Sequence, residues 1–217
     1  MTEKIHEYQG EQITVRYNVK RCIHAAECVR GLPLVFDPKQ KPWVQPGQAT
    51  VDELAAVIER CPSGALHYQR QGGGPAEASP SHNTILTTVN GPLHLRGEVV
   101  VTAAAGATWQ DTRLALCRCG ASQNKPFCDN SHIEADFQAA GTREAVSSQT
   151  SEAEAGGPLS VNPAPNGPLL LQGNFEIYGI DGQLIFSGDK TALCRCGQSG
   201  NKPFCDGMHR KVGFQAD

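Results

Sequence analysis

The cysteines constrain this chain more than any other residue type, because all nine fall into three groups of three. The groups are Cys22, Cys28 and Cys61; Cys117, Cys119 and Cys128; and Cys194, Cys196 and Cys205. An odd number of cysteines argues against a simple disulfide framework. The N-terminal sequence MTEKIHE lacks the apolar stretch of a secretory signal. We therefore expect a cytoplasmic protein with reduced thiols, and we interpret the three groups as metal ligands.

Composition argues against two classes of partner. The chain of 217 residues carries a net charge of −3, which gives no sign of a nucleic-acid partner. No run approaches the roughly 20 apolar residues that a membrane-spanning helix needs, so we expect no membrane contact. The length allows two or three small domains, and a domain of about 60 residues usually needs a stabilising metal.

Two stretches rich in Gly, Pro and Ser, at 69–82 and 140–165, have no apolar period and are typical of linkers. They divide the chain into three predicted domains, which cover residues 1–68, 83–139 and 166–217. Each domain then contains one of the three groups of cysteines.

The second and third domains are copies of one another. The stretch ALCRCGASQNKPFCDNSH at 115–132 aligns with ALCRCGQSGNKPFCDGMH at 192–209 at a constant offset of 77. Upstream, NGPLHLRG at 90–97 aligns with NGPLLLQG at 166–173 at an offset of 76. A match of this length indicates the duplication of a whole module.

Local patterns predict the main elements. In the second copy, runs at 174–178 and 183–187 flank an Asp181-Gly182 turn and predict a β-hairpin, with looser counterparts at 99–102 and 112–116 in the first copy. The cysteine loop follows the last strand of each module, and a short helix follows the loop.

The first domain shows a mixed pattern. Apolar residues alternate over 13–19, which predicts a strand. Thr50 and Glu53 have the spacing of a capping box, which predicts a helix over 51–60. A short strand is expected near 65–68.

The duplicated loop has the spacing C-x-C-x8-C-x3-H. Its candidate ligands are Cys117, Cys119, Cys128 and His132 in the first copy, and Cys194, Cys196, Cys205 and His209 in the second. An extended Cys-x-Cys points both side chains the same way, so the pair can bind one metal ion. The third cysteine and the histidine lie four residues apart, on one face of an incipient helix, and can bind a second. Thiolate and imidazole ligands suit an iron–sulfur cluster or a structural Cys3His zinc site, and the spacing alone leaves both open.

Both loops resemble the CDGSH iron–sulfur domain of the mitoNEET kind, whose pattern is C-x-C-x2-[ST]-x3-P-x-C-D-G-[STA]-H. The matching residues besides the ligands are Ser122, Pro126 and Asp129, and Ser199, Pro203, Asp206 and Gly207. The resemblance implies one [2Fe–2S] cluster per loop, with the cysteine pair on one iron and cysteine plus histidine on the other. Family members with one motif dimerise through swapped strands. Two copies in one chain therefore predict an intramolecular pseudo-dimer and a monomeric protein.

Residues around the ligands lead to further expectations. Asn130 stands where the motif has Gly, and Met208 where it has a small residue, so hydrogen bonds to cluster sulfur are expected to differ between the copies. Asp129 and Asp206 are expected to contribute to cluster binding as N-caps, since a capped helix start aims N–H groups at an anionic cluster. We interpret the basic residues of the loops as solvated charges; these are Arg118, Lys125, Arg195 and Lys202.

The first domain resembles a divergent mono-cluster ferredoxin-type domain, through RCIHAAEC at 21–28 and CPSGAL at 61–66. Ala25 occupies the position of the missing ligand. We predict a [3Fe–4S] cluster bound by Cys22, Cys28 and Cys61. The alternatives are a [4Fe–4S] cluster, with water or His24 at the open corner, and a domain that has lost its cluster.

Together these patterns predict an α+β protein, with a small ferredoxin-like domain followed by two β-rich iron–sulfur modules. We find no flavin or nicotinamide motif and no nucleophile–base pair, so we expect no enzyme. The predicted function is one-electron transfer to a redox partner protein. The alternatives are storage and transfer of clusters to apo-proteins, and a zinc-stabilised interaction module.

Overall fold

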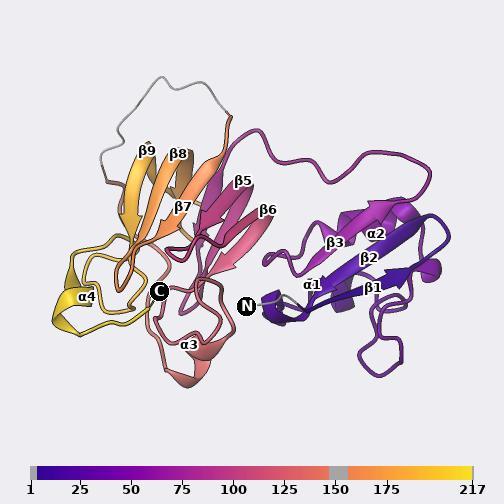
Figure 1. Cartoon of the computed structure of the whole chain (residues 1–217), viewed down its shortest axis with the longest axis horizontal. Coiled ribbons are helices and arrows are strands. Elements are labelled where there is room, and N and C mark those ends of the chain that lie inside the picture. Colours follow the sequence, from indigo (N-terminus) through magenta and orange to yellow (C-terminus); the bar gives the residue numbers. More distant parts are fainter. Residues whose placement is uncertain (1–3, 147–155, 217) are drawn as a thin grey trace. The chain divides into compact units, whose positions relative to one another are not determined.

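A computed structural model describes residues 4–146 and 156–216, and the chain divides into two compact units, Met1–Ala78 and Ser79–Asp217 (Figure 1). The predicted boundaries assign the two repeat modules to separate domains, whereas in the structure both modules belong to the second unit. None of the helices in the described part of the chain is both long and apolar enough to cross a membrane.

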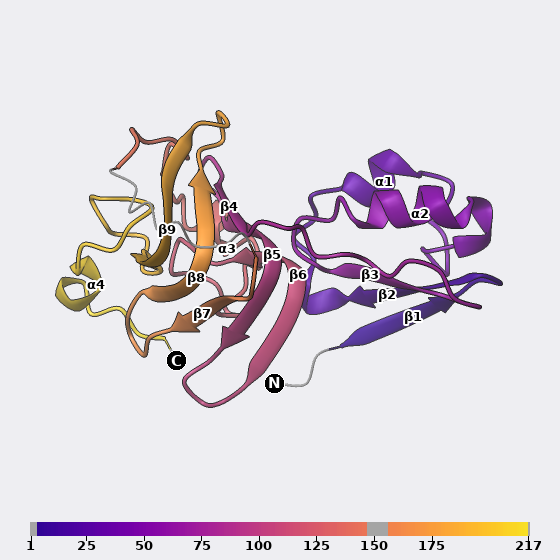
Figure 2. The same ribbon diagram turned by 90° about the horizontal axis from the view of Figure 1, so that it is seen from above.

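The first unit is a three-stranded antiparallel sheet with two helices on one face (Figure 2). Its elements are β1 (Ile5–Gln9), β2 (Ile13–Asn18), β3 (Leu66–Arg70), α1 (Glu27–Gly31), α2 (Val51–Ile58), and the 3-10 turns η1 (Val19–Arg21) and η2 (Pro46–Gln48). The alternation predicted for β2 is confirmed, because Ile13 and Val15 are buried in one core with Leu54 and Ile58 of α2.

Two local signals place the cysteines of this unit. Thr50 Oγ1 accepts a hydrogen bond from Glu53 N (3.3 Å), and the Glu53 carboxylate accepts one from Thr50 N (3.0 Å), which confirms the predicted start of α2. This helix ends at Ile58, before Cys61. Strand β2 ends at Asn18, whose side chain accepts a hydrogen bond from Lys20 N (3.1 Å) and starts the turn η1 that leads to Cys22.

The second unit is built on a six-stranded sheet. The first module provides β4 (Thr84–Thr87), β5 (Leu93–Thr102), β6 (Thr108–Leu116) and α3 (Ser131–Glu134), and the second provides β7 (Leu159–Pro163), β8 (Leu169–Tyr178), β9 (Leu184–Leu193) and α4 (Met208–Lys211). The predicted hairpins are confirmed as β5–β6 and β8–β9, with longer strands than the sequence indicated.

Each module completes the sheet of the other. Strand β4 pairs antiparallel with β5 and parallel with β8, while β7 pairs antiparallel with β8 and parallel with β5. The long strands β5 and β8 each take two partners on one edge, on either side of a bulge between Arg96 and Val99 or between Gln172 and Phe175. Apolar side chains of all six strands form one core.

The structure corrects the predicted linker at 140–165, because β7 lies inside it. Leu159, Val161 and Pro163 are buried at alternate positions, the period of a strand with one buried face. Pro and Gly around this short run obscured the pattern. Strand β7 follows β4 at the repeat offset, so the second module begins before residue 166, and β3 likewise runs to Arg70 inside the predicted linker at 69–82. Residues 147–155 of the predicted linker lie outside the described residues.

Candidate metal centres

The two cysteine loops extend from the ends of β6 and β9 and close in the same way. Cys117 N donates a hydrogen bond to Pro126 O (2.8 Å), and Cys128 N donates one to Ala115 O (2.9 Å). The second loop repeats both bonds at 2.8 and 2.9 Å, through Cys194 and Cys205. These bonds bring the third cysteine of each loop back beside the first two, across eight intervening residues.

Serine hydroxyls of the motif form hydrogen bonds to the backbone inside each loop. Ser122 Oγ donates to Phe127 O (2.7 Å) and accepts from Asn124 N (3.0 Å). Ser199 makes the matching bonds in the second loop, at 2.7 and 2.9 Å. Both hydroxyls are buried, so their bonds stabilise the loop without competition from water.

The predicted ligands come together as two pairs in each loop. Sγ atoms of the Cys-x-Cys pair lie 3.8 Å apart in both copies, for Cys117 with Cys119 and for Cys194 with Cys196. The third sulfur lies near histidine Nδ1, at 3.5 Å for Cys128 with His132 and 3.4 Å for Cys205 with His209.

These spacings match tetrahedral coordination. Metal–sulfur bonds of about 2.3 Å and metal–nitrogen bonds of about 2.1 Å place two sulfurs about 3.8 Å apart, and sulfur and nitrogen about 3.6 Å apart. Each pair can therefore bind one metal ion without rearrangement. Among the residues that the structure describes, no three His, Cys, Asp or Glu side chains converge on a single ion site.

Protonation of the first loop follows from burial and from contacts between its donors. The hydrogen bond between Cys117 and Cys119 raises the pKa of Cys117 and lowers that of Cys119 to about 6. Burial raises the pKa of Cys128 to about 11 and lowers the pKa of His132. Neutral imidazole is the form that binds metal, whereas the buried thiols must release protons when a metal binds.

Backbone N–H groups point at the ligand sulfurs. Asn130 N lies 3.4 Å from Cys128 Sγ, and Gly207 N lies 3.4 Å from Cys205 Sγ. Both residues have positive φ, 71° and 84°, and Asn tolerates this conformation better than most residues. The substitution of Gly by Asn130 therefore preserves this hydrogen bond, and the expected difference between the copies does not occur at this position.

The N-cap prediction for Asp129 and Asp206 is wrong by one position. The caps are Asn130 and Gly207, and neither forms a side-chain capping bond. Asp129 instead accepts bonds from Ser131 N (3.0 Å) and Gln123 N (2.7 Å), so its carboxylate connects the helix start to the cysteine loop. Asp206 does the same through Met208 N (3.0 Å) and Gly200 N (2.8 Å).

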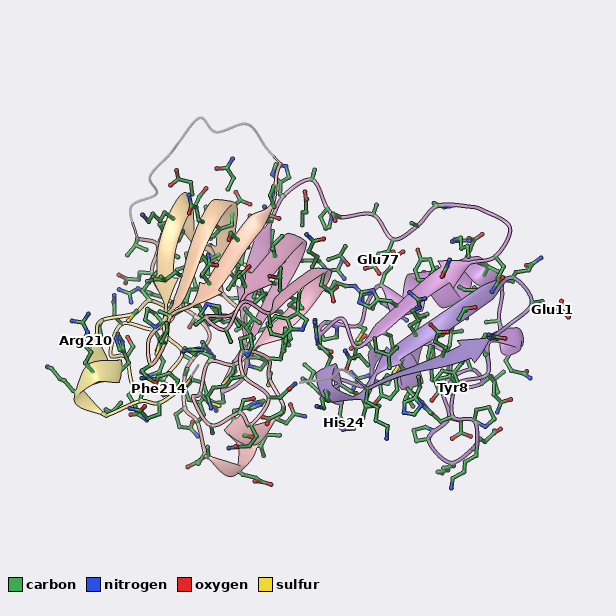
Figure 3. The ribbon with its side chains drawn as sticks, viewed as in Figure 1. Tyr8, Glu11, His24, Glu77, Arg210 and Phe214 are labelled. Atoms are coloured by element: carbon green, nitrogen blue, oxygen red, sulfur yellow. The ribbon has the colours of Figure 1, made fainter. Side chains whose placement is uncertain are left out.

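The interpretation of Arg118 and Arg195 as solvated charges is also wrong. Their exposed fractions are 2% and 1%. Arg118 Nε donates to Gly91 O (3.0 Å) and Arg195 Nε to Gly167 O (3.0 Å), bonds that tie each loop to the turn before the long strand. The guanidinium groups stack on Phe137 at 5.3 Å and Phe214 at 5.4 Å, respectively, and Figure 3 shows Phe214 beside α4. A strand-like C-R-C stretch gave no sequence signal for this burial.

The two loops abut at the glycines that follow the Cys-x-Cys pairs. A Cβ on Gly120 would lie 2.8 Å from Cys196 O, and one on Gly197 would lie 2.3 Å from Cys119 O. Both glycines also have positive φ, 85° and 79°. Backbone of each loop therefore contacts a ligand residue of the other loop, which brings the two candidate centres close together.

Cys22, Cys28 and Cys61 of the first unit line one largely apolar cavity. Burial raises the pKa of Cys28 to about 11, with smaller contributions from the other two thiols. Ser63 Oγ lies 3.7 Å from Cys61 Sγ.

Tyr17 is a further residue of this site, and it forms a hydrogen bond with Cys22. The pKa of Tyr17 is raised, chiefly by burial and then by this bond. The strand pattern marked Tyr17 as a core residue and gave no indication of this role.

In the described part of the chain, the structure gathers no fourth His, Cys, Asp or Glu side chain with the three cysteines at one metal site. Ala25 and His24 both line it, and neither provides a donor that the structure brings into hydrogen-bond contact with a cysteine. His24 lies on the loop before α1, is exposed and has a positive φ of 52° (Figure 3).

Paired Cys and His donors in two copies, together with a third group of thiols, define an iron–sulfur-binding protein. The family model described as "Iron-binding zinc finger CDGSH type" matches residues 90–133 and 166–210, and "Divergent 4Fe-4S mono-cluster" matches residues 8–71. The chain belongs to the CDGSH family of iron–sulfur proteins, with two CDGSH domains preceded by a divergent mono-cluster domain.

Relatives of the first unit support the same assignment. "Uncharacterized protein YjdI" of Escherichia coli K12 is 44% identical over 64 residues, which are 30% of this chain and 84% of the relative. YjdI of Escherichia coli O157:H7 matches over the same share of each chain, also at 44% identity. The relatives thus consist of little more than this one unit. No solved structure matches the chain.

Proposed function

We propose that the protein carries single electrons through two [2Fe–2S] clusters, one in each CDGSH loop, and a third cluster in the first unit. The observation that carries this proposal is the arrangement of each loop's donors as two pairs at tetrahedral spacing. A mononuclear zinc site needs four converging donors, whereas a [2Fe–2S] cluster needs two donors on each of two irons.

The contact between the loops supports electron transfer. Gly120 and Gly197 allow the ligand residues Cys119 and Cys196 to approach through backbone atoms. With a cluster bound in each loop, this contact would provide a short route for an electron between the two. In this account the two modules act as an intramolecular pseudo-dimer, and the shared strands β4 and β7 support a monomeric chain, since they satisfy sheet edges that a second copy would otherwise cover.

The first unit, in this proposal, is a ferredoxin-like α+β domain that binds [3Fe–4S] through Cys22, Cys28 and Cys61. Ala25 stands at the position of the missing ligand and cannot bind iron, which favours three irons over four. A [4Fe–4S] cluster with a solvent ligand is the alternative. The expected partner is a redox protein in the cytoplasm, and we propose that the chain itself catalyses no reaction.

Delivery of clusters to apo-proteins is the second candidate function. One observation favours it: His132 and His209 are less buried than most of the cysteine ligands, so protons can reach them from solvent. A protonated imidazole no longer binds iron, whereas a thiolate is held more firmly. Cluster transfer to an apo-ferredoxin, timed against reversible reduction by a chemical donor, would distinguish delivery from electron transfer.

Electron paramagnetic resonance of the protein as isolated tests the assignment of the first unit. An oxidised [3Fe–4S] cluster is paramagnetic, whereas oxidised [2Fe–2S] and [4Fe–4S]2+ clusters are silent. We expect a signal in the oxidised protein that disappears in Cys22→Ala. Silence when oxidised, followed by a signal from this unit on reduction, would contradict the three-iron assignment.

A further inference from the structure

A cavity of about 280 Å³ lies beside the second cluster loop. Its walls come from both modules: Thr87 at the end of β4, the segment 138–142 that follows the first module, and residues 199, 200, 202 and 203 of the second loop. The cavity is distinct from the one lined by the ligands of the first loop, although Arg118 lines both.

Arg118 brings a buried positive charge to the wall of this cavity. Its Nε and Nη2 donate to the carbonyl oxygens of Gly91 and Thr88, while Nη1 makes no hydrogen bond to the residues that the structure describes. None of the described ion pairs includes this buried guanidinium. The acidic groups that act on it are the thiols of Cys194 and Cys119. Buried cations normally have an anionic partner.

A second cation lines the cavity, and a third contacts the second loop without lining the cavity. Lys202 lines the cavity, and its Nζ donates to Ser199 O (2.7 Å). Arg143 follows the wall segment and donates from Nη1 to Asn201 O (2.9 Å). Among the residues that the structure describes, no Asp or Glu lines the cavity, and the Asp206 carboxylate of the second loop accepts a hydrogen bond from Gly200 N.

We propose that this cavity binds a small oxyanion, a phosphate or a carboxylate, between Lys202 and Arg118. Its volume is close to the lower limit of about 300 Å³ for small-molecule sites, which favours an inorganic or very small organic anion. Charge-assisted hydrogen bonds to Arg and Lys are the usual means of holding such groups. Anion binding is a property separate from the proposed electron transfer, because it can be measured whether or not the clusters carry electrons.

An anion bound at this site would affect the reduction potential of the clusters. Arg118 lies within the electrostatic reach of Cys119 in one loop and Cys194 in the other. A bound anion would offset this positive charge and disfavour the addition of an electron. Occupancy of the cavity should therefore lower the reduction potential of the CDGSH clusters.

The repeat provides a matched control for the test. Lys125 occupies the equivalent position in the first loop and donates in the same way to Ser122 O (2.5 Å), but it does not line the cavity. Calorimetric titration of the cluster-loaded protein with phosphate, acetate and chloride at equal ionic strength measures binding directly. We expect saturable binding of phosphate or acetate but not chloride, about tenfold weaker in Lys202→Gln and unchanged in Lys125→Gln.

The relative affinities of phosphate and acetate identify the class of oxyanion. Equal loss in both lysine variants, or a response to chloride equal to that of phosphate and acetate, would overturn the proposal. So would the lack of saturable binding of either oxyanion. Visible absorbance reports cluster content in each sample, so a failure of anion binding is distinguishable from a failure of the iron–sulfur assignment. If Lys202→Gln loses its clusters, the comparison of oxyanions with chloride in the unmodified protein still decides.

Discussion

The two repeat modules present the same donor atoms but place them in different surroundings. Sulfur–sulfur spacings are identical, and sulfur–nitrogen spacings differ by only 0.1 Å, at 3.5 and 3.4 Å. The loops are closed by the same backbone bonds. After duplication, coordination geometry has thus been retained in both copies.

The two modules differ in the residues that surround the ligands. Ser131 Oγ donates to Asp129 (2.7 Å), a bond that Met208 cannot make to Asp206. Arg143 contacts Asn201 of the second loop and stacks on Phe204 at 5.6 Å. His94 on β5 corresponds to Leu170 on β8. Ligand geometry therefore constrains the sequence tightly, while residues that tune or stabilise a cluster are free to diverge.

The largest expected effect concerns the histidine ligands. His132→Cys and His209→Cys each replace a neutral donor with an anionic one, which disfavours the reduced cluster. We expect the potential of the altered cluster to fall by roughly 100 mV or more, by a similar amount in both modules. Potentiometric titration over a range of pH values measures this, and the pH dependence due to the replaced imidazole should vanish. An unchanged potential and pH profile in either variant would remove that histidine from coordination.

The contact between the loops gives the next largest effect. Gly197→Ala would place a Cβ 2.3 Å from Cys119 O, and Gly120→Ala would place one 2.8 Å from Cys196 O. Gly182→Ala is the matched control, because its φ of 77° is similar and nothing lies within 4 Å of the added Cβ. We expect the control to lower the free energy of unfolding by about 1 kcal/mol and the loop variants by about 1–3 kcal/mol more.

Urea unfolding of the three glycine variants measures this difference. Gly197→Ala should be the most destabilised, since its contact is the shortest. Equal stability of all three variants would show that the loops do not abut in solution.

A smaller effect on stability is expected from His94 on β5, which corresponds to Leu170 on β8. Burial lowers the pKa of His94 to about 4, and its Nε2 has no partner among the described residues. The unfolded chain then binds a proton near pH 6.5 while the folded chain stays neutral, so His94 destabilises the fold as pH falls from about 6.5 to 4. His94→Leu introduces the residue found at the equivalent position, Leu170. It should reduce the loss of unfolding free energy at low pH by roughly 2 kcal/mol.

Unfolding free energies at pH 7 and pH 4.5 for the unmodified protein and His94→Leu provide the measurement. Other histidines titrate in the same range, so the informative quantity is the difference between the two proteins. An identical pH dependence in both would show that His94 is exposed to solvent in the folded state.

Local signals in the sequence predicted the ligands and most elements, and long-range contacts account for what they missed. The Asp181-Gly182 turn, the Thr50–Glu53 capping box and the spacing of the cysteines act between near neighbours. Strand β7 was missed because its pairing with β5 and β8 joins segments far apart in the chain. Burial of Arg118 depends on carbonyls about 30 residues away, at Thr88 and Gly91. The hydrogen bond of Tyr17 to Cys22 was not predicted, because a strand pattern indicates which side chains are buried and not which partners they bond.

A count of metal and sulfide in a variant that lacks Cys22, Cys28 and Cys61 tests most directly whether each CDGSH loop binds a [2Fe–2S] cluster. Replacing all three with Ala removes the predicted cluster of the first unit and leaves both CDGSH loops intact. We expect about four irons and four acid-labile sulfides per chain, held as two [2Fe–2S] clusters. About two zinc ions per chain without sulfide would contradict it, because the donor pairs would then converge on single ions.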